Sequence, residues 1–220
     1  MPLSSVVGAQ SIIKSGVCTS TTRPASPFEG QMIFETDTDR LYVWNGTTWV
    51  IPNSPAQNPQ GLELVSTTTV TSGSSVTVSN CFSSTYDAYK IIMSNGATTA
   101  NGTMSFQFSG ITTGYYIGIM YYAWAAGAGT PAIYSAANQS TWQEVGSTSP
   151  SGIALNMDVI NPYLPKFKQY SCAAPNLNTS GSFVVTNGIC SNTAQATGFV
   201  LSHGTTFTSG TVRVYGYRNS

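Results

Sequence analysis

The residues of this chain that could act as a base or a nucleophile are few and scattered. Its single histidine, His203, stands in Leu201-Ser-His-Gly-Thr205 at the end of a predicted strand. A serine–histidine triad also needs a nucleophile and an acid, and no spacing in the sequence identifies them. The GxSxG, HExxH, P-loop and dinucleotide-binding glycine patterns are absent. We therefore interpret His203 as a turn or packing residue and predict that the protein is not an enzyme.

Acidic side chains are sparse in the larger, C-terminal part of the chain, which holds Glu63, Asp87, Glu144 and Asp158. Glycoside hydrolysis uses two carboxyl groups roughly 5–10 Å apart. Glu144 and Asp158 fall on neighbouring predicted strands, so a pair of this kind is conceivable. Scattered acids give almost any pair that chance, however, and we keep a hydrolase only as a remote alternative.

The four cysteines are Cys18, Cys81, Cys172 and Cys190, and none stands in a CxxC motif or beside a histidine. Zinc is therefore not predicted. Synthesis in a reducing cytosol favours free, buried thiols. A Cys172–Cys190 bridge is the best disulfide candidate, although sequence separation alone cannot place the two residues within bonding range.

Asp37-Thr-Asp39 could offer carboxylates to calcium, but the remaining ligands of the usual roughly six to eight oxygens would have to come from elsewhere. We favour an Asx-type turn that closes a hairpin. No metal and no cofactor are predicted.

Aromatic side chains cluster in sequence around a predicted loop of small residues, Ala123 to Ala137. The cluster comprises Tyr115, Tyr116, Tyr121, Tyr122, Trp124, Tyr134 and Trp142. The favoured interpretation is that these rings line the core and a subunit interface. The alternative is a stacking platform for a glycan, because tyrosine and tryptophan combine an apolar face with a polar tip. Its predicted contacts are Tyr121, Tyr122, Trp124 and Trp142.

The elements that must position these residues are β-strands. Residues 62–220 contain short runs of β-forming residues separated by Gly, Asn, Ser and Pro, and no segment keeps a 3.6-residue period. The predicted strands are Leu62–Val70, Ser75–Ser79, Ala88–Ser94, Thr103–Ser109, Tyr115–Tyr122, Ser140–Val145, Gly152–Val159, Lys166–Cys172, Ser182–Thr186, Thr197–Ser202 and Thr211–Tyr217. We predict an all-β protein whose C-terminal domain is an antiparallel, jelly-roll-like β-sandwich.

The N-terminal quarter has a different organisation. Residues 1–22 form an arm, for which an extended form and a weak helix pattern remain equally open. Residues 23–51 predict a small β-meander with a tight turn at Asn45-Gly46. Residues 52–61 contain three prolines and predict a stiff, extended linker. The meander is too small to bury its own aromatic load, so we predict that it lies at a subunit or virion interface through Met32, Phe34, Tyr42, Trp44 and Trp49.

Composition narrows the possible partners. Charged residues make up only 7% of the chain, and the formal net charge is zero. A chain with so few charges and no net charge creates no electrostatic field that would attract nucleic acid. Residues 1–9 lack the basic and apolar regions of a signal peptide, and no apolar run approaches the roughly 18 residues of a membrane span, so neither export nor membrane insertion is predicted.

The meander resembles a short module that recurs in tail-fibre and other structural proteins of tailed bacteriophages. The matching residues are Arg23-Pro24, Glu29-Gly-Gln31, Ile33-Phe-Glu-Thr-Asp-Thr38, Tyr42-Val-Trp-Asn-Gly46 and Trp49. Met1–Ser20 looks like the N-termini of such virion proteins. Phe82–Lys90 and Ser209–Tyr217 look like parts of β-sandwich domains that end fibre or decoration proteins of aquatic phages, including cyanophages.

The resemblance implies a particle component, often trimeric, with an N-terminal anchor and a C-terminal outer domain. We therefore expect a homotrimeric fibre or adhesin of the virion, made in the bacterial cytoplasm, that contacts other virion proteins and possesses an outward sandwich facing the host surface or its glycan. The main alternative is a capsid decoration or cement protein on the phage head. A glycan-degrading tailspike is the remote alternative, because no parallel β-helix repeat is visible.

Overall fold

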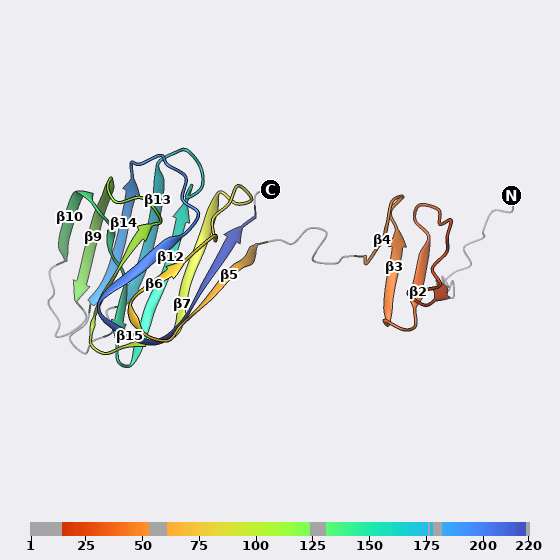
Figure 1. Cartoon of the computed structure of the whole chain (residues 1–220), viewed down its shortest axis with the longest axis horizontal. Helices are drawn as coiled ribbons and strands as arrows, with labels where there is room; N and C mark the ends of the chain where they lie inside the picture. Colours follow the sequence, from red (N-terminus) through yellow and green to blue (C-terminus); the bar gives the residue numbers. More distant parts are fainter. Residues whose placement is uncertain (1–14, 53–60, 124–130, 176, 178–181, 219–220) are drawn as a thin grey trace. The chain divides into compact units, whose positions relative to one another are not determined.

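The computed structural model describes residues 15–52, 61–123, 131–175, 177 and 182–218. The chain divides into two compact units, Met1–Gln60 and Gly61–Ser220. This boundary falls inside the proline-rich segment, whose residues 53–60 lie outside the described residues. All regular elements of the described residues are β-strands (Figure 1), so the prediction of an all-β protein is confirmed.

The first unit is a small sheet with the strand order β1-β2-β3-β4. Its strands are β1 (Gly16–Cys18), β2 (Met32–Glu35), β3 (Arg40–Trp44) and β4 (Trp49–Val50). Strand β1 runs parallel to β2, and the other pairs are antiparallel. The end of the predicted arm is therefore a strand of the meander sheet rather than a helix.

The predicted turn at Asn45 is present. The Asn45 carboxamide accepts hydrogen bonds from the backbone amides of Thr47 (3.0 Å) and Thr48 (2.8 Å). Gly46 has a φ of 90°, which a residue with a side chain rarely adopts. These two residues close the β3–β4 hairpin.

The second unit is built from eleven strands. They are β5 (Leu62–Val70), β6 (Gly73–Val78), β7 (Ala88–Thr98), β8 (Gly102–Phe108), β9 (Tyr115–Ala123), β10 (Ala132–Gln139), β11 (Trp142–Ser149), β12 (Gly152–Ile160), β13 (Lys168–Pro175), β14 (Ser182–Cys190) and β15 (Phe199–Tyr217). Two predictions need correction. Most of β10 lies within the predicted loop Ala123–Ala137, and β15 joins two predicted strands into one of 19 residues.

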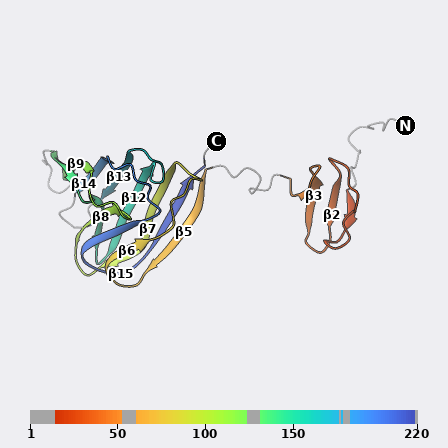
Figure 2. The ribbon, with the colours of Figure 1, turned by 45° about the horizontal axis from the view of Figure 1, so that its top comes forward.

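The long strand β15 connects two faces of an antiparallel sandwich (Figure 1 and Figure 2). Its first part pairs with β6 and β8, and its second part pairs with β5 and β7. The broader face follows the order β5-β15-β7-β12-β13-β14-β9-β10, and the other face follows β6-β15-β8-β11. Because β11 also pairs with β12, the strands β7, β12, β11, β8 and β15 form a closed ring.

Aromatic rings fill the space between the faces. Phe106 and Phe108 on β8 are fully buried, and they share one face because side chains alternate along a strand. Trp142 of β11 stacks on Tyr170 of β13 with ring centroids 4.3 Å apart, and it lies 5.4 Å from Tyr115 of β9. The core therefore packs the smaller face against the middle of the broader face.

Candidate functional site

One face of the small N-terminal sheet is covered by no other described element of the first unit. Strand pairing places Met32 opposite Val43, Phe34 opposite Leu41, and Val17 opposite Phe34, so these side chains share a face. Val17 is 71% exposed, Met32 is 38% exposed, and the others are half-buried. We call this surface the open face. It exposes apolar side chains to water within a single chain.

The opposite face contains Ile33, Tyr42, Trp44 and Trp49. Ile33 is 1% exposed, and among residues 15–52 it is the only fully buried apolar residue. Trp44 and Trp49 are half-buried, with ring centroids 5.5 Å apart in an edge-to-face arrangement. The five predicted interface residues therefore do not share one surface: only Met32 and Phe34 belong to the open face. From sequence the five residues are predicted as one interface, although the alternation of side chains along each strand places them on opposite faces of the sheet.

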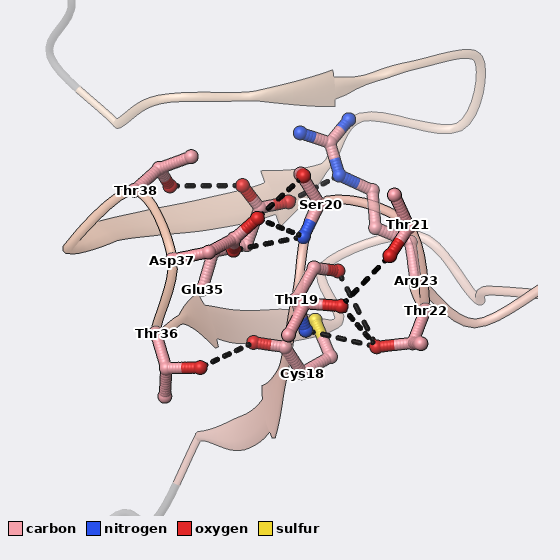
Figure 3. Close-up of polar contacts among 10 residues, drawn as sticks. All are labelled: Cys18, Thr19, Ser20, Thr21, Thr22, Arg23, Glu35, Thr36, Asp37 and Thr38. Atoms are coloured by element: carbon pink, nitrogen blue, oxygen red, sulfur yellow. Dashed lines mark hydrogen bonds and ion pairs between the residues drawn. The ribbon is translucent and has the colours of Figure 1, made fainter.

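Polar contacts hold the end of the arm against the β2–β3 hairpin (Figure 3). Arg23 pairs with Glu35, whose other carboxylate oxygen accepts a hydrogen bond from Thr38 Oγ1 (2.9 Å). The Arg23 guanidinium also lies 4.7 Å from the centre of the Tyr42 ring. Arg23 and Glu35 enter the sequence-based expectations only as parts of the resemblance, and no contact between them is predicted, because nothing in their spacing links them.

Asp37 makes a second contact between the arm and the hairpin. We call the Arg23–Glu35 pair and the contact of Asp37 with Ser20 together the polar lock. Its carboxylate accepts hydrogen bonds from the backbone amide of Ser20 (2.9 Å) and from Ser20 Oγ (2.5 Å). Asp37 thus fixes the arm rather than closing an Asx turn, while Asp39 takes a turn conformation with a φ of 52°. No group of three or more His, Cys, Asp or Glu side chains suited to a metal occurs among the described residues.

Both carboxylates of the lock have lowered pKa values. The Arg23 hydrogen bond lowers the pKa of Glu35 below 4.5, and Thr38 adds to this against the opposing effect of desolvation. The Ser20 hydroxyl similarly lowers the pKa of Asp37 below 3.8. A lowered folded-state pKa contributes stability above the unfolded-state value, and this stability is lost as the pH falls through the folded-state value.

We therefore expect the first unit to melt at a lower temperature below about pH 4.5 than at pH 7. The measurement is thermal unfolding followed by the indole NMR signals of Trp44 and Trp49 between pH 7 and pH 3. Glu35→Gln is the matched variant, and it should flatten the upper part of this pH dependence. An equal melting temperature at pH 3 and pH 7 would contradict the assigned role of the lock.

In the second unit, the structure corrects the predicted glycan platform. Trp142 has 0% exposure, and its indole Nε1–H donates a hydrogen bond to the Ile189 carbonyl (3.2 Å), so it is a core residue. Tyr121 is half-buried, and desolvation, together with a hydrogen bond to Glu144, raises the pKa of its hydroxyl. Tyr122 is 56% exposed. Trp124 lies outside the described residues.

Six exposed apolar residues of this unit gather instead on the outer surface of β9, β10 and β14. They are Tyr116, Met120, Tyr122, Ile133, Phe183 and Ile189. Cross-strand pairing confirms the common face, because Met120 lies opposite both Ile133 and Val185, and Tyr122 lies opposite Phe183. Tyr122 thus keeps an exposed position, but with neighbours that the sequence cluster did not identify.

Next to these residues, the outer surface of the broader face is hollowed into an open trough of about 240 Å³. It is lined by Lys90, Asn156, Asp158, Ser171, Cys172, Ala173, Val185 and Asn187, which come from β7, β12, β13 and β14. Lys90 Nζ donates to Asp158 Oδ2 (3.0 Å), and the Tyr217 hydroxyl donates to Asp158 Oδ1 (2.6 Å). Desolvation and this last contact raise the pKa of Tyr217 to about 12.

The two carboxylates considered for glycoside hydrolysis do not line one cavity. Asp158 lies in the trough, whereas Glu144 lines a separate small cavity of about 10 Å³ with Thr103 and Gly146. Asp158 is engaged by a lysine and a tyrosine, and Glu144 is engaged by Tyr121. This geometry does not supply the acid–nucleophile pair of a glycosidase.

The cysteines and His203 have structural surroundings. All four cysteines are free, and the pairing of β13 with β14 places Cys172 opposite Thr186 rather than Cys190. Burial raises the pKa of Cys172 to about 11. His203 is buried, with Nδ1 accepting from the Thr205 amide (3.1 Å) and Nε2 lying 2.6 Å from Thr148 Oγ1. Burial lowers the pKa of His203, which fits the predicted packing role.

No family model, curated protein or solved structure matches this chain. Within the described ranges, no helix is long and apolar enough to cross a membrane.

Proposed function

We propose that this chain is a structural protein of a tailed-phage virion, a homotrimeric fibre or adhesin that attaches through its N-terminal unit. The second unit then contacts the host surface through the outer surface of its broader face. The protein performs no catalysis, and its partners are two further copies of itself, other virion proteins and a surface receptor.

The observation that carries this proposal is the open face of the first unit. A sheet of four short strands with a single fully buried apolar residue in the described region has little core of its own. Small units with so little burial are stabilised by association when no disulfide or metal is present. A second layer supplied by other chains would remove Val17, Met32, Phe34, Leu41 and Val43 from water at about 25 cal/mol per Å² of apolar surface.

Two further features support assembly on a particle. The low charge content lets hydroxyl and amide side chains pack between subunits without the cost of burying ions. The order of residues in the first unit resembles the module of phage structural proteins, and in the structure this stretch is a separate sheet with its own polar lock. Cyclic symmetry also suits a projection that stands on a symmetric particle.

We expect light scattering at micromolar concentration to give three times the 23.2 kDa mass of one chain. The physical reason is burial of the open face between subunits. A mass of one chain across the same concentration range would overturn the trimer. Gold-labelled antibodies on purified virions distinguish the two placements, because a fibre is labelled at the tail and a decoration protein over the head.

A further inference from the structure

The trough on the broader face has the shape and chemistry of a saccharide subsite, and we propose that it binds a neutral sugar residue. This inference deepens the proposed adhesin role, on which it rests for its biological meaning, by naming the class of receptor.

The hollow arises from residue size along adjacent strands. Ser171 and Ala173 on β13 are small and exposed, whereas their neighbours on β12 and β14 are longer. Lys90, Asp158, Ser171 and Asn187 form one row across the sheet, since each lies opposite the next in the strand pairing. The row continues to Gly118 on β9, which has no side chain to block it. The trough is therefore a property of the sheet itself rather than of a loop.

The polar groups of the trough match the hydroxyls of a sugar. Asn156, Ser171 and Asn187 are exposed, and in the described part of the chain their side chains make no hydrogen bond. A carboxamide offers both donors and an acceptor, a carboxylate offers acceptors only, and an ammonium offers donors only. Each sugar hydroxyl donates one hydrogen bond and accepts up to two, so adjacent hydroxyls can bridge Asp158 and Asn187 in the same row.

Charge selects a neutral ligand over an anionic one. Lys90 and Asp158 neutralise each other at 3.0 Å, and their side chains are only 20% and 34% exposed. Among the residues that the structure describes, no other charged side chain lines the trough. A phosphate or a carboxylate would meet Asp158 without a free cation to offset the repulsion. The uncharged amides and the hydroxyl suit a ligand without formal charge.

Part of the lining of the trough is apolar. Ala173 and Val185 line it, and Met120 lies opposite Val185 on β9. These side chains can cover the C–H face of a pyranose ring while the amides hold its hydroxyls. The volume of about 240 Å³ is below the roughly 300–1,000 Å³ of ordinary ligand pockets, so we expect millimolar affinity for one sugar. Three copies on one fibre would raise the avidity through effective concentration.

The test is saturation-transfer difference NMR on the full-length chain with methyl glycosides of glucose, galactose, mannose, rhamnose and N-acetylglucosamine, and with glucose 6-phosphate as the anionic comparator. We expect transfer to at least one neutral sugar, with binding about tenfold weaker in Asn187→Ala, which removes one hydrogen-bonding amide. Asn101→Ala, at an exposed position between β7 and β8, is the matched control and should bind as the unaltered chain does.

Three outcomes overturn the inference: no transfer to any neutral sugar, transfer only to glucose 6-phosphate, or unchanged binding in an Asn156→Ala/Asn187→Ala double variant that keeps the unfolding midpoint of the unaltered chain. The oligomeric mass is measured separately, so the two proposals can fail independently. A trimer that binds no sugar refutes the subsite alone, and a monomer that binds sugar refutes the trimer alone.

Discussion

Trp142→Ala is expected to lower the free energy of unfolding of the sandwich unit by about 3–5 kcal/mol, the usual cost of truncating a fully buried tryptophan. Trp142 stacks on Tyr170 (4.3 Å between centroids) and Phe106 (5.4 Å), and Phe108 meets it edge-on at 5.1 Å. The variant also leaves the Ile189 carbonyl without its indole donor. Because the ring touches both faces of the sandwich, the cavity left behind cannot close by a movement of one strand alone.

Urea unfolding of the full-length chain, followed by far-UV circular dichroism, measures this loss. Tyr122→Ala is the control, because it removes an aromatic ring that is 56% exposed and should change stability by less than about 0.5 kcal/mol. Equal midpoints for Trp142→Ala and the unaltered chain would show that Trp142 is not a core residue.

Trp142 is a core residue, as the favoured interpretation has it, but the sequence could not exclude the glycan platform, for an identifiable physical reason. Alternation assigns faces only where strand register is regular, and β11 is irregular between Trp142 and Gly146. Glu144, in the middle of this stretch, has a φ of 55°, which interrupts the extended conformation. The alternation of inward and outward side chains along β11 is therefore interrupted near Glu144. The pairing of β8 with β15 and that of β9 with β14 are regular, and there alternation places Phe106 inside and Tyr122 outside.

Strand boundaries were hard to predict where composition is ambiguous. Strand β10 begins among small residues whose local preference does not distinguish a strand from a loop, and its pairing with β9 supplies the structure. Strand β15 passes through Gly204 and Gly210, which look like turn signals, yet the chain continues from one face to the other. Gly210 has a φ of 149° and lies beside Met93, so close packing explains this glycine better than a turn does.

The polar lock and the trough both depend on residues that are distant in sequence. Ser20 and Asp37 are 17 residues apart, and Lys90 and Asp158 are 68 apart. No local pattern predicts such pairs. Local composition does predict the meander, the hairpin turn at Asn45-Gly46 and the division near residue 60. Local chemistry thus predicts the elements, and only the strand pairing shows which side chains can cooperate in a site.

Met32→Asp is expected to convert the proposed trimer into monomers. Met32 is 38% exposed on the open face, so an aspartate there costs a single chain little. In an assembled interface the same carboxylate would be buried among Val17, Phe34 and Val43, at a cost of several kcal/mol without a paired cation. Subunit contacts of this size are sensitive to one buried charge, because a few central residues carry most of the binding energy.

Light scattering of Met32→Asp at micromolar concentration measures the dissociation, and unchanged indole NMR signals of Trp44 and Trp49 show that the first unit remains folded. Thr47→Asp is the control, since it adds the same charge at an exposed turn residue and should leave the trimer intact. A trimeric Met32→Asp protein would remove the open face from the interface. In that case Trp44 and Trp49, on the other face, become the next candidates, and Trp44→Ala decides between the two surfaces.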